Sequence, residues 1–257
     1  MAWTKGAEKV VSTKSTLSLP PSVADAQGPG EREIARVVTT AEVDRQDRPA
    51  VAVDVVILSV RDGRLEVILV KRNHPPFEGL WSIPGGFVRY DESLEAAAKR
   101  KLAEVTGVSD VYLEQLYTFG DPERDPRMRV ITVVYYALIR ADQLQTPSRD
   151  GDTSYQVCWA YDLPSLAFDH ESIMRYSLQR LRAKLEYTTI GFQLLGHEFT
   201  MSELQEVYQA ILNRKLDKRN FRKKLLLMRI VEPTSHTKMV GPHRPAQLFR
   251  FNPRAVP

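Results

Sequence analysis

The sequence lacks the features of a secreted or membrane-anchored protein. A single cysteine among 257 residues excludes a disulfide within the chain. The longest nearly uncharged apolar runs are about ten residues, whereas a membrane-spanning helix needs roughly 20. The first twenty residues contain charged side chains and no apolar core, so we expect no secretory signal peptide. These absences predict a cytoplasmic protein without a membrane span.

Negative charge is scarce toward the C-terminal end. From residue 187 onward, 12 lysines and arginines stand against 5 aspartates and glutamates, whereas the preceding residues have 24 against 27. An excess of one sign favours binding to a polyanion such as nucleic acid. The sequence therefore predicts a basic C-terminal domain joined to a nearly neutral body.

Composition divides the chain into three parts. Residues 1–47 are polar and rich in Ser, Thr, Pro and Gly, which is typical of a disordered leader. Residues 48–186 combine β-branched apolar runs with two amphipathic helical patterns. Residues 187–257 follow a different pattern of short helices and strands. We predict a leader and two folded domains with boundaries at these positions.

The first folded domain is expected to be a sheet with two helices. The expected strands are 51–60, 65–70, 111–118, 129–139 and 156–160, and the first of them is apolar and rich in β-branched residues. An Asp-Gly turn at residues 62–63 should join the first two strands into a hairpin. Helical periodicity predicts helices over 93–106 and 171–185. Asp91 is the expected N-cap of the first helix and Gly107 its terminating residue.

One stretch near the middle of the chain has a characteristic spacing. Gly86 is followed six residues later by Glu92, and Arg100 comes eight residues after that. The pair Gly107-Val108 closes the stretch. This frame resembles the Nudix box, and flanking similarities extend the resemblance over about residues 51–170. The resemblance implies a Nudix-like α/β/α sandwich with a mixed sheet.

The resemblance covers the frame of the box but not its metal ligands. In the Nudix family, three helical glutamates hold Mg²⁺, which prefers oxygen ligands. The matching positions are Lys101, Glu104 and Val105, which share one helix face because they lie three and four residues apart. Lys101 would repel a dication there. We predict no catalytic residues and no metal site, and an active Nudix hydrolase that cleaves ADP-ribose is the alternative.

A Nudix-like fold without these ligands can still bind a nucleotide diphosphate. Arg72 and Arg127 suit phosphate because guanidinium groups form charge-assisted, bidentate hydrogen bonds. Phe77 and Trp81 either stack on a base or ribose or belong to the core. Arg100 either contacts the ligand or ties the loop by pairing with an acidic neighbour. The complete predicted effector site is Arg72, Phe77, Trp81, Gly86, Glu92, Arg100, Glu104 and Arg127.

The basic domain has two capped helices separated by a short turn. Thr200 begins a capping-box sequence, and Asp217 is a suitable N-cap for the second helix. Strand-like segments follow at 230–231 and 247–251, with a loop between them that begins near Pro233. Helix, turn, helix and hairpin in this order predict a winged helix-turn-helix. The whole chain is therefore expected to be of the α+β class.

The second helix of this domain is expected to contact DNA. A helical wheel places Phe221, Leu225 and Met228 on a buried stripe, with basic side chains opposite. Arginine can read guanine and asparagine can read adenine, whereas lysines suit phosphates. The predicted DNA-binding residues are Lys215, Lys218, Arg219, Asn220, Arg222, Lys223, Lys224, Lys238 and Arg244. The alternatives are a merely solvated basic face, or a module that binds RNA or protein.

A degenerate Nudix box joined to a basic winged helix resembles the NrtR group of transcriptional regulators, and residues 216–224 are similar to the recognition-helix segment of that group. The resemblance implies a homodimer that holds a palindromic operator of double-stranded DNA. It implies a repressor of NAD-metabolism genes that requires no cofactor and releases DNA when it binds ADP-ribose or a related nucleotide. Other members sense sugars such as arabinose, so a sugar-responsive regulator is an open alternative.

Overall fold

The computed structural model describes residues 48–144, 155–239 and 245–255. The predicted leader and Arg244 lie outside the described residues. Within these ranges, no helix is both long and apolar enough to cross a membrane.

A mixed sheet forms the centre of the first domain. Its strands are β1 (Ala50–Arg61), β2 (Arg64–Lys71), β3 (Trp81–Ser82), β4 (Gly85–Phe87), β5 (Tyr112–Phe119), β6 (Val130–Leu138) and β7 (Tyr155–Trp159). The main path runs β3-β2-β1-β6-β5, with β4 paired to β1 and β7 paired to β2. β1 and β6 are parallel, and the other pairs are antiparallel. The five expected strands and the mixed sheet are confirmed.

The hairpin between β1 and β2 turns at the predicted position. Asp62 and Gly63 have positive φ angles of 50° and 70°, as a two-residue hairpin turn of the I′ type requires. The strands then pair in register from Arg61 opposite Arg64 to Leu58 opposite Val67. The hairpin places β1 in the middle of the sheet, between β2 and β6.

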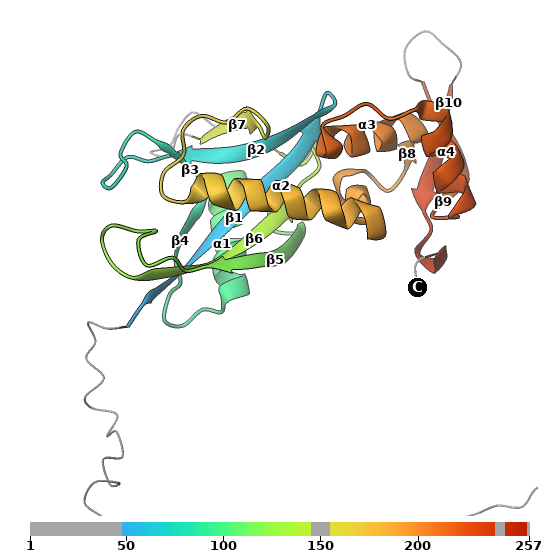
Figure 1. Cartoon of the computed structure of the whole chain (residues 1–257). Coiled ribbons are helices and arrows are strands. Elements are labelled where there is room, and N and C mark those ends of the chain that lie inside the picture. The colour runs from blue at the N-terminus through green and yellow to red at the C-terminus, as the bar shows by residue number, and fades with distance from the viewer. Residues whose placement is uncertain (1–47, 145–154, 240–244, 256–257) are drawn as a thin grey trace, which may run out of the picture. The chain divides into compact units, whose positions relative to one another are not determined.

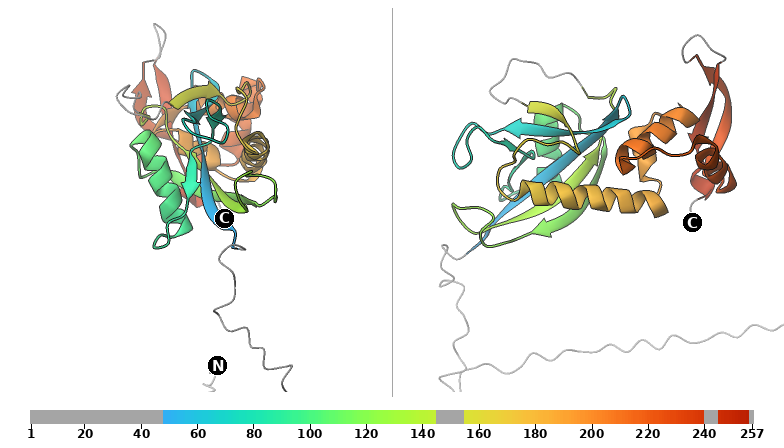
Figure 2. Two further views of the ribbon diagram at one scale, coloured as in Figure 1. Left: turned by 90° about the vertical axis from the view of Figure 1, so that its left-hand side faces the viewer. Right: turned by 45° about the horizontal axis from the view of Figure 1, so that its top comes forward.

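Two helices cover the two faces of this sheet (Figure 1), and the view turned by 90° shows them on opposite sides (Figure 2). α1 (Leu94–Thr106) buries Ala97 and Leu102 against one face. α2 (His170–Tyr187) buries Ile173 in the cluster on the other face. These layers confirm the predicted α/β/α sandwich.

The N-cap of α1 lies two residues after the predicted position. Ser93 is the N-cap, and its Oγ accepts a hydrogen bond from the backbone N–H of Ala96 at 3.1 Å. Asp91 instead lies in the preceding turn, so this detail of the prediction was wrong. Both residue types suit the cap, and the loop before the helix decides which one meets the first free N–H groups. Gly107 ends the helix with a φ of 69°, as predicted.

The second domain has the elements of a winged helix-turn-helix. Its elements are the short 3-10 helix η3 (Ile190–Leu194), β8 (Phe199–Thr200), α3 (Met201–Leu212), α4 (Lys218–Leu227), β9 (Val231–Lys238), β10 (Ala246–Phe251) and the 3-10 helix η4 (Pro253–Ala255). The strands form a sheet in the order β8-β10-β9. Thr200 and Glu203 form the predicted capping box, and Asp217 caps α4 by accepting from the N–H of Asn220 at 2.8 Å.

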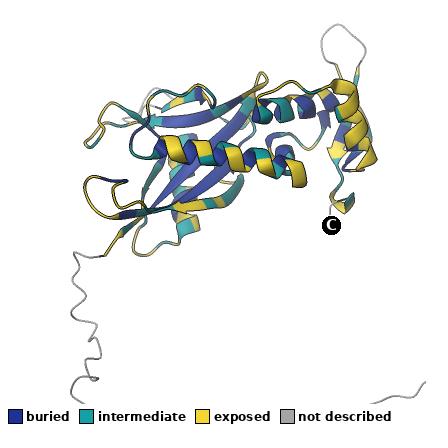
Figure 3. Cartoon of the chain, in the orientation of Figure 1, coloured by how far each residue is buried: buried dark blue, intermediate teal, exposed yellow. Residues whose placement is uncertain are grey.

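Two details of this domain correct the prediction. Pro233 lies inside β9 rather than in a loop. β9 is an edge strand of its sheet, where the missing N–H of a proline is tolerated. Met228 is 48% exposed because α4 ends at Leu227, and of the expected stripe only Leu225 is fully buried. Figure 3 shows how much of α4 is exposed.

The two domains share one hydrophobic core. Val207 and Ile211 of α3 belong to the same buried cluster as Leu69 of β2 and the buried side chains of α2. The backbone oxygen of Ile211 also accepts hydrogen bonds from the Tyr161 hydroxyl and, at 3.3 Å, from Arg182 Nε of α2. The last turns of α2 therefore contact α3, while its first turn reaches the pocket at the other end of the helix.

Candidate functional site

A pocket of about 320 Å³ opens where β1, β2, β4 and α1 meet the start of α2. Four of the predicted effector residues line it, namely Arg72, Gly86, Glu104 and Arg127. The charged loop after β5 also contributes Arg124 and Asp125. The pocket therefore brings the box and that loop to the same end of the domain.

The other four predicted effector residues do not line this pocket. Trp81 is half-buried and packs against the core, which favours the core role for this side chain. Phe77 is 39% exposed and contacts the ring of Phe168 edge-on, with 4.9 Å between ring centroids. Glu92 and Arg100 pair with each other beside the loop before α1. Phe77 is therefore the one of the four that touches an aromatic side chain of the pocket wall.

Phe168 lines the pocket together with Phe87, and the sequence predicted neither of them as a site residue. The Phe168 ring lies beside two arginines. Its ring centroid lies 4.7 Å from the guanidinium carbon of Arg72 and 5.8 Å from that of Arg127. Burial and the neighbouring Arg127 lower the pKa of Arg72 from its usual value, but an arginine remains charged at neutral pH. Two guanidinium groups beside one ring suit a ligand that joins phosphates to an aromatic base.

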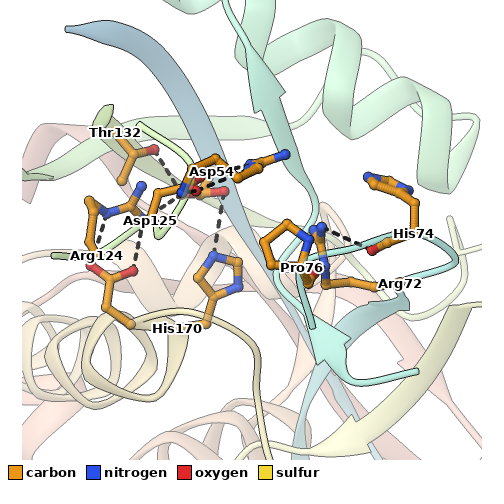
Figure 4. A network of polar contacts seen from close by, with 10 residues as sticks. Asp54, Arg72, His74, Pro76, Arg124, Asp125, Thr132 and His170 are labelled. Atoms are coloured by element: carbon orange, nitrogen blue, oxygen red, sulfur yellow. Dashed lines mark hydrogen bonds and ion pairs between the residues drawn. The ribbon is translucent and has the colours of Figure 1, made fainter. Parts of the chain in front are cut away.

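A buried polar network lies beside the pocket (Figure 4). Asp54 of β1 is 6% exposed and accepts a hydrogen bond from Thr132 Oγ1 at 2.7 Å. Arg124 donates two hydrogen bonds, of 2.7 and 3.0 Å, to Asp169, and its Nη2 lies 3.6 Å from Asp54 Oδ2. The arginine thus compensates two carboxylates that would otherwise be costly to bury.

His170 completes the network at the first turn of α2. Its Nδ1 accepts a hydrogen bond from the backbone N–H of Ile83 at 2.9 Å, so the proton of the neutral ring is on Nε2. That nitrogen lies 3.9 Å from Asp54 Oδ1. Burial lowers the pKa of His170, although the nearby carboxylates of Asp54 and Asp169 oppose the shift. The ring therefore stays neutral and links the start of α2 to the sheet.

The box residues of α1 form a chain of ion pairs. Arg100 contacts Glu92 at 2.5 and 3.0 Å and Glu104 at 3.1 Å. Lys101 Nζ donates to the other oxygen of Glu104 at 2.7 Å. Burial would raise the pKa of Glu104, but the hydrogen bonds from Lys101 and Arg100 lower it overall. Arg100 therefore ties the loop to the helix, the second of the two roles considered for it.

Replacing Glu92 by glutamine should lower the melting temperature by a few degrees near pH 7. Hydrogen bonds from Arg100 and from the backbone of Arg89 lower the pKa of Glu92 from 4.5 to about 2. A depressed pKa stabilises the folded state above the unfolded-state value, and this contribution is lost as the pH falls from about 4.5 toward about 2. Melting curves at successive pH values should therefore converge for the two chains over that range.

Glu95→Gln is the matched control for this substitution. Glu95 lies in the first turn of α1 and pairs at 2.7 Å with Lys99, but both side chains are more than half exposed. An exposed pair of this kind contributes little to stability. If Glu92→Gln changed the melting temperature no more than Glu95→Gln near pH 7, the loop–helix ion pair would have no stabilising role.

The box does not fit a magnesium ion. Both oxygens of Glu104 are engaged by cations, and Val105 packs against the core. Lys101 supplies an ammonium group at the remaining position. In the part of the chain that the structure describes, no three His, Cys, Asp or Glu side chains are grouped as metal ligands. This donor set is unlike the oxygen-rich octahedron that Mg²⁺ requires.

α4 presents a basic surface. The predicted DNA-binding residues on and just before α4, all of them exposed, are Lys215, Lys218, Arg219, Asn220, Arg222, Lys223 and Lys224. Lys238, at the end of β9, donates to Glu203 of α3 at 2.7 Å and so is tied to the helix that precedes the turn. The carboxylate of Asp217 caps α4. The exposed side chains of the helix are cations, one asparagine and, in its last turn, Leu226 and Leu227.

Comparison with known proteins gives two family matches. The NUDIX domain model covers residues 48–181, and the model of the NrtR DNA-binding winged helix domain covers residues 191–251. A protein of Acinetobacter baylyi named "ADPR responsive transcriptional repressor NtrR" is 38% identical over 216 residues, which are 82% of this chain and 86% of that protein. The chain belongs to the NrtR-type Nudix regulators. The resemblance seen in the box and in α4 is thereby confirmed.

Solved structures agree with the NrtR-type architecture. The crystal structure of Shewanella oneidensis NrtR complexed with a 27mer DNA matches with a TM-score of 0.69 and 34% identity, over 80% of this chain and 95% of that chain. The NrtR-type match thus includes both domains.

An ADP-ribose pyrophosphatase of Methanocaldococcus jannaschii is 36% identical over 129 residues, which are 49% of this chain and 72% of that protein.

The pocket residues of this NrtR-type chain that escaped prediction from sequence include Asp54, Arg124, Phe168 and His170. Asp54 interrupts an otherwise apolar strand, and a lone carboxylate in such a strand is a signal that a partner must be near. Arg124 belongs to the charged loop that was expected at this end of the domain. Phe168 and His170 follow a turn and have no local signal of their own.

Proposed function

We propose that the protein is an ADP-ribose-responsive transcriptional repressor that binds DNA through α4. The observation that carries this proposal is the exposed basic face of α4, joined through one hydrophobic core to a Nudix pocket. The relative from Acinetobacter baylyi is named for the same response and the same role. The proposal thus assigns metabolite binding to the pocket and DNA binding to α4.

The residues of the pocket have separate tasks in this proposal. Arg72 and Arg127 hold the phosphates by charge-assisted hydrogen bonds. Phe168 supports the adenine or the ribose beside them, with Phe77 at the rim. α2 links the pocket to α3 because its first residue, His170, lines the pocket and its last turns pack on α3. Ligand binding then favours the arrangement of α3 and α4 that no longer matches the operator.

On DNA, the protein is proposed to act as a cytoplasmic homodimer on a palindromic operator near genes of NAD metabolism. Two winged helices related by a two-fold axis contact half-sites about one helical turn apart. Titration of labelled promoter DNA, with and without ADP-ribose, NAD and arabinose, tests this function. We expect specific binding that ADP-ribose weakens at least about 10-fold, which corresponds to a coupling of roughly 1.4 kcal/mol. Release by arabinose alone would instead assign the protein to the sugar-responsive alternative.

Arg219→Ala should weaken binding to the operator by about 10- to 100-fold, because one base-reading contact contributes roughly 1–3 kcal/mol. Arg219 is exposed in the first turn of α4 and belongs to no capping interaction. Fluorescence anisotropy at fixed salt, with operator and scrambled duplex, measures both affinities. Lys99→Ala removes the same charge from α1 and should leave operator binding unchanged. An equal loss on both duplexes for Arg219→Ala would reassign this residue to phosphate contact.

Hydrolysis of ADP-ribose is the second candidate function, and the similarity to the Methanocaldococcus jannaschii pyrophosphatase favours it. The donor set of the box opposes it, since Lys101 and Arg100 engage both oxygens of Glu104. We therefore propose binding without cleavage. Incubation of the protein with ADP-ribose and Mg²⁺, followed by chromatography for AMP, decides between the two. Turnover at about 1 s⁻¹ or faster, the usual enzymatic range, would make the chain a hydrolase.

A further inference from the structure

We propose that Lys101 takes the place of the divalent cation of the Nudix box, so that its ammonium group holds the diphosphate of the ligand without a metal ion. This inference rests on the proposed function, in which the pocket binds ADP-ribose or a related nucleoside diphosphate. It starts from the disagreement between the family's metal chemistry and the donor set of this chain.

Lys101 is held in a fixed position at the wall of the pocket. Its Nζ donates to Glu104 Oε2 at 2.7 Å, and its side chain is only 22% exposed. The chain of methylene groups passes directly over Gly86, where a Cβ atom would lie 2.6 Å from Lys101 Cε and 3.1 Å from Nζ. The glycine that opens the box therefore leaves the space that this lysine occupies, and both residues line the pocket.

The charge of the pocket supports the same assignment. Five cationic side chains line it, Lys71, Arg72, Lys101, Arg124 and Arg127, together with three carboxylates, Asp54, Glu104 and Asp125. These lining side chains have a formal excess of two positive charges, which matches in magnitude the two negative charges of a diphosphate diester. The Arg124 side chain is 4% exposed and is held by Asp169, so Lys101 joins Arg72 and Arg127 as the cations assigned to the phosphates.

An ammonium group and a metal ion differ in what they do to bound water. A divalent cation neutralises phosphate charge and also lowers the pKa of a coordinated water so that it can attack. An ammonium group donates hydrogen bonds to phosphate oxygens but has no open coordination position for a water molecule. In this proposal, Lys101 therefore binds the diphosphate without activating a water molecule to cleave it.

The test is calorimetric titration with ADP-ribose in EDTA and again in excess Mg²⁺, on the full chain and on Lys101→Met. We expect the unchanged chain to bind equally well in both buffers. Lys101→Met should bind about 10- to 100-fold more weakly in both, the usual effect of losing one charge-assisted hydrogen bond. Lys99→Met, which removes an exposed charge from the same helix, should bind like the unchanged chain.

Each other outcome has a distinct meaning. Binding by the unchanged chain that requires Mg²⁺ would overturn the role of Lys101, and so would undiminished binding by Lys101→Met. In both cases the proposed ADP-ribose response would survive. If the unchanged chain bound no ADP-ribose in either buffer, the proposed function itself would fail, and the role of Lys101 with it. Melting curves recorded on the same samples show that a weaker-binding variant is still folded.

Discussion

Arg124→Met is expected to lower the free energy of unfolding by about 3–5 kcal/mol, the usual cost of leaving buried charges without a partner. The Arg124 side chain is 4% exposed and faces two carboxylates, Asp169 at 2.7 Å and Asp54 at 3.6 Å. Methionine fills much of the same volume, so the loss of stability is due to the missing charge rather than to a cavity. Urea unfolding of both chains, followed by circular dichroism, gives the difference directly.

Two further variants make this result specific. Arg175→Met removes an exposed arginine of α2 whose one side-chain hydrogen bond among the described residues goes to Ser172, and it should cost less than about 0.5 kcal/mol. Adding Asp54→Asn to Arg124→Met should recover part of the loss, because the uncompensated carboxylate is then absent. A loss for Arg124→Met as small as that for Arg175→Met would mean that the buried network does not stabilise the fold.

Gly85→Ala is expected to affect mainly stability and Gly86→Ala mainly ligand binding, although the residues are neighbours. A Cβ atom at Gly85 would lie 2.0 Å from Asp54 Oδ1 and 2.7 Å from the backbone oxygen of Val53, so strand β1 would have to move. We expect a loss of about 3 kcal/mol in stability, at the upper end of the range for overpacking. At Gly86 the obstacle is the flexible end of Lys101, which can turn aside.

Gly86→Ala should therefore cost less than about 1 kcal/mol in stability but displace the Lys101 ammonium group from the pocket. Its affinity for ADP-ribose should fall about as much as that of Lys101→Met. Thermal melts and calorimetric titrations on the two alanine variants separate these effects. If Gly86→Ala bound ADP-ribose like the unchanged chain, the position of Lys101 over Gly86 would not be required for ligand binding.

The parts of the fold that depend on local chemistry could be predicted from the sequence. Gly86, Glu92, Arg100 and Gly107 fix a loop, a helix and its end within one short stretch, and the structure shows that element at the pocket. The capping box at Thr200 and the cap at the start of α4 are local in the same way. Such features require only neighbours along the chain, so a single sequence is sufficient to find them.

The opposite wall of the pocket depends on contacts between distant segments. Thr132 and Asp54 are 78 positions apart, Arg124 and Asp169 are 45 apart, and the bond from Ile83 to His170 spans 87. No periodicity connects these positions. They meet because β1 and β6 are parallel neighbours and α2 begins beside them.

Single apolar side chains were the other source of error. Trp81 was equally compatible with a ligand and with the core until β3 paired with β2 and turned its ring into the hydrophobic cluster. Met228 fitted the helical wheel, but a wheel does not show where a helix ends. Both cases depend on whether a neighbour covers the side chain, which periodicity alone does not specify.

The hydrophobic core that continues from the sheet into α3 restricts how a regulator of this type can change the DNA sequence that it recognises. Val207, Ala210 and Ile211 fill space between α2 and the strands of the Nudix domain, so they belong to the ligand-binding body as much as to the DNA-binding part. A winged helix taken from another protein would pack correctly only if its side chains at these three positions fitted α2 and the strands of the Nudix domain. Substitutions confined to the outward side of α4 avoid that requirement, and new DNA specificity is more accessible there.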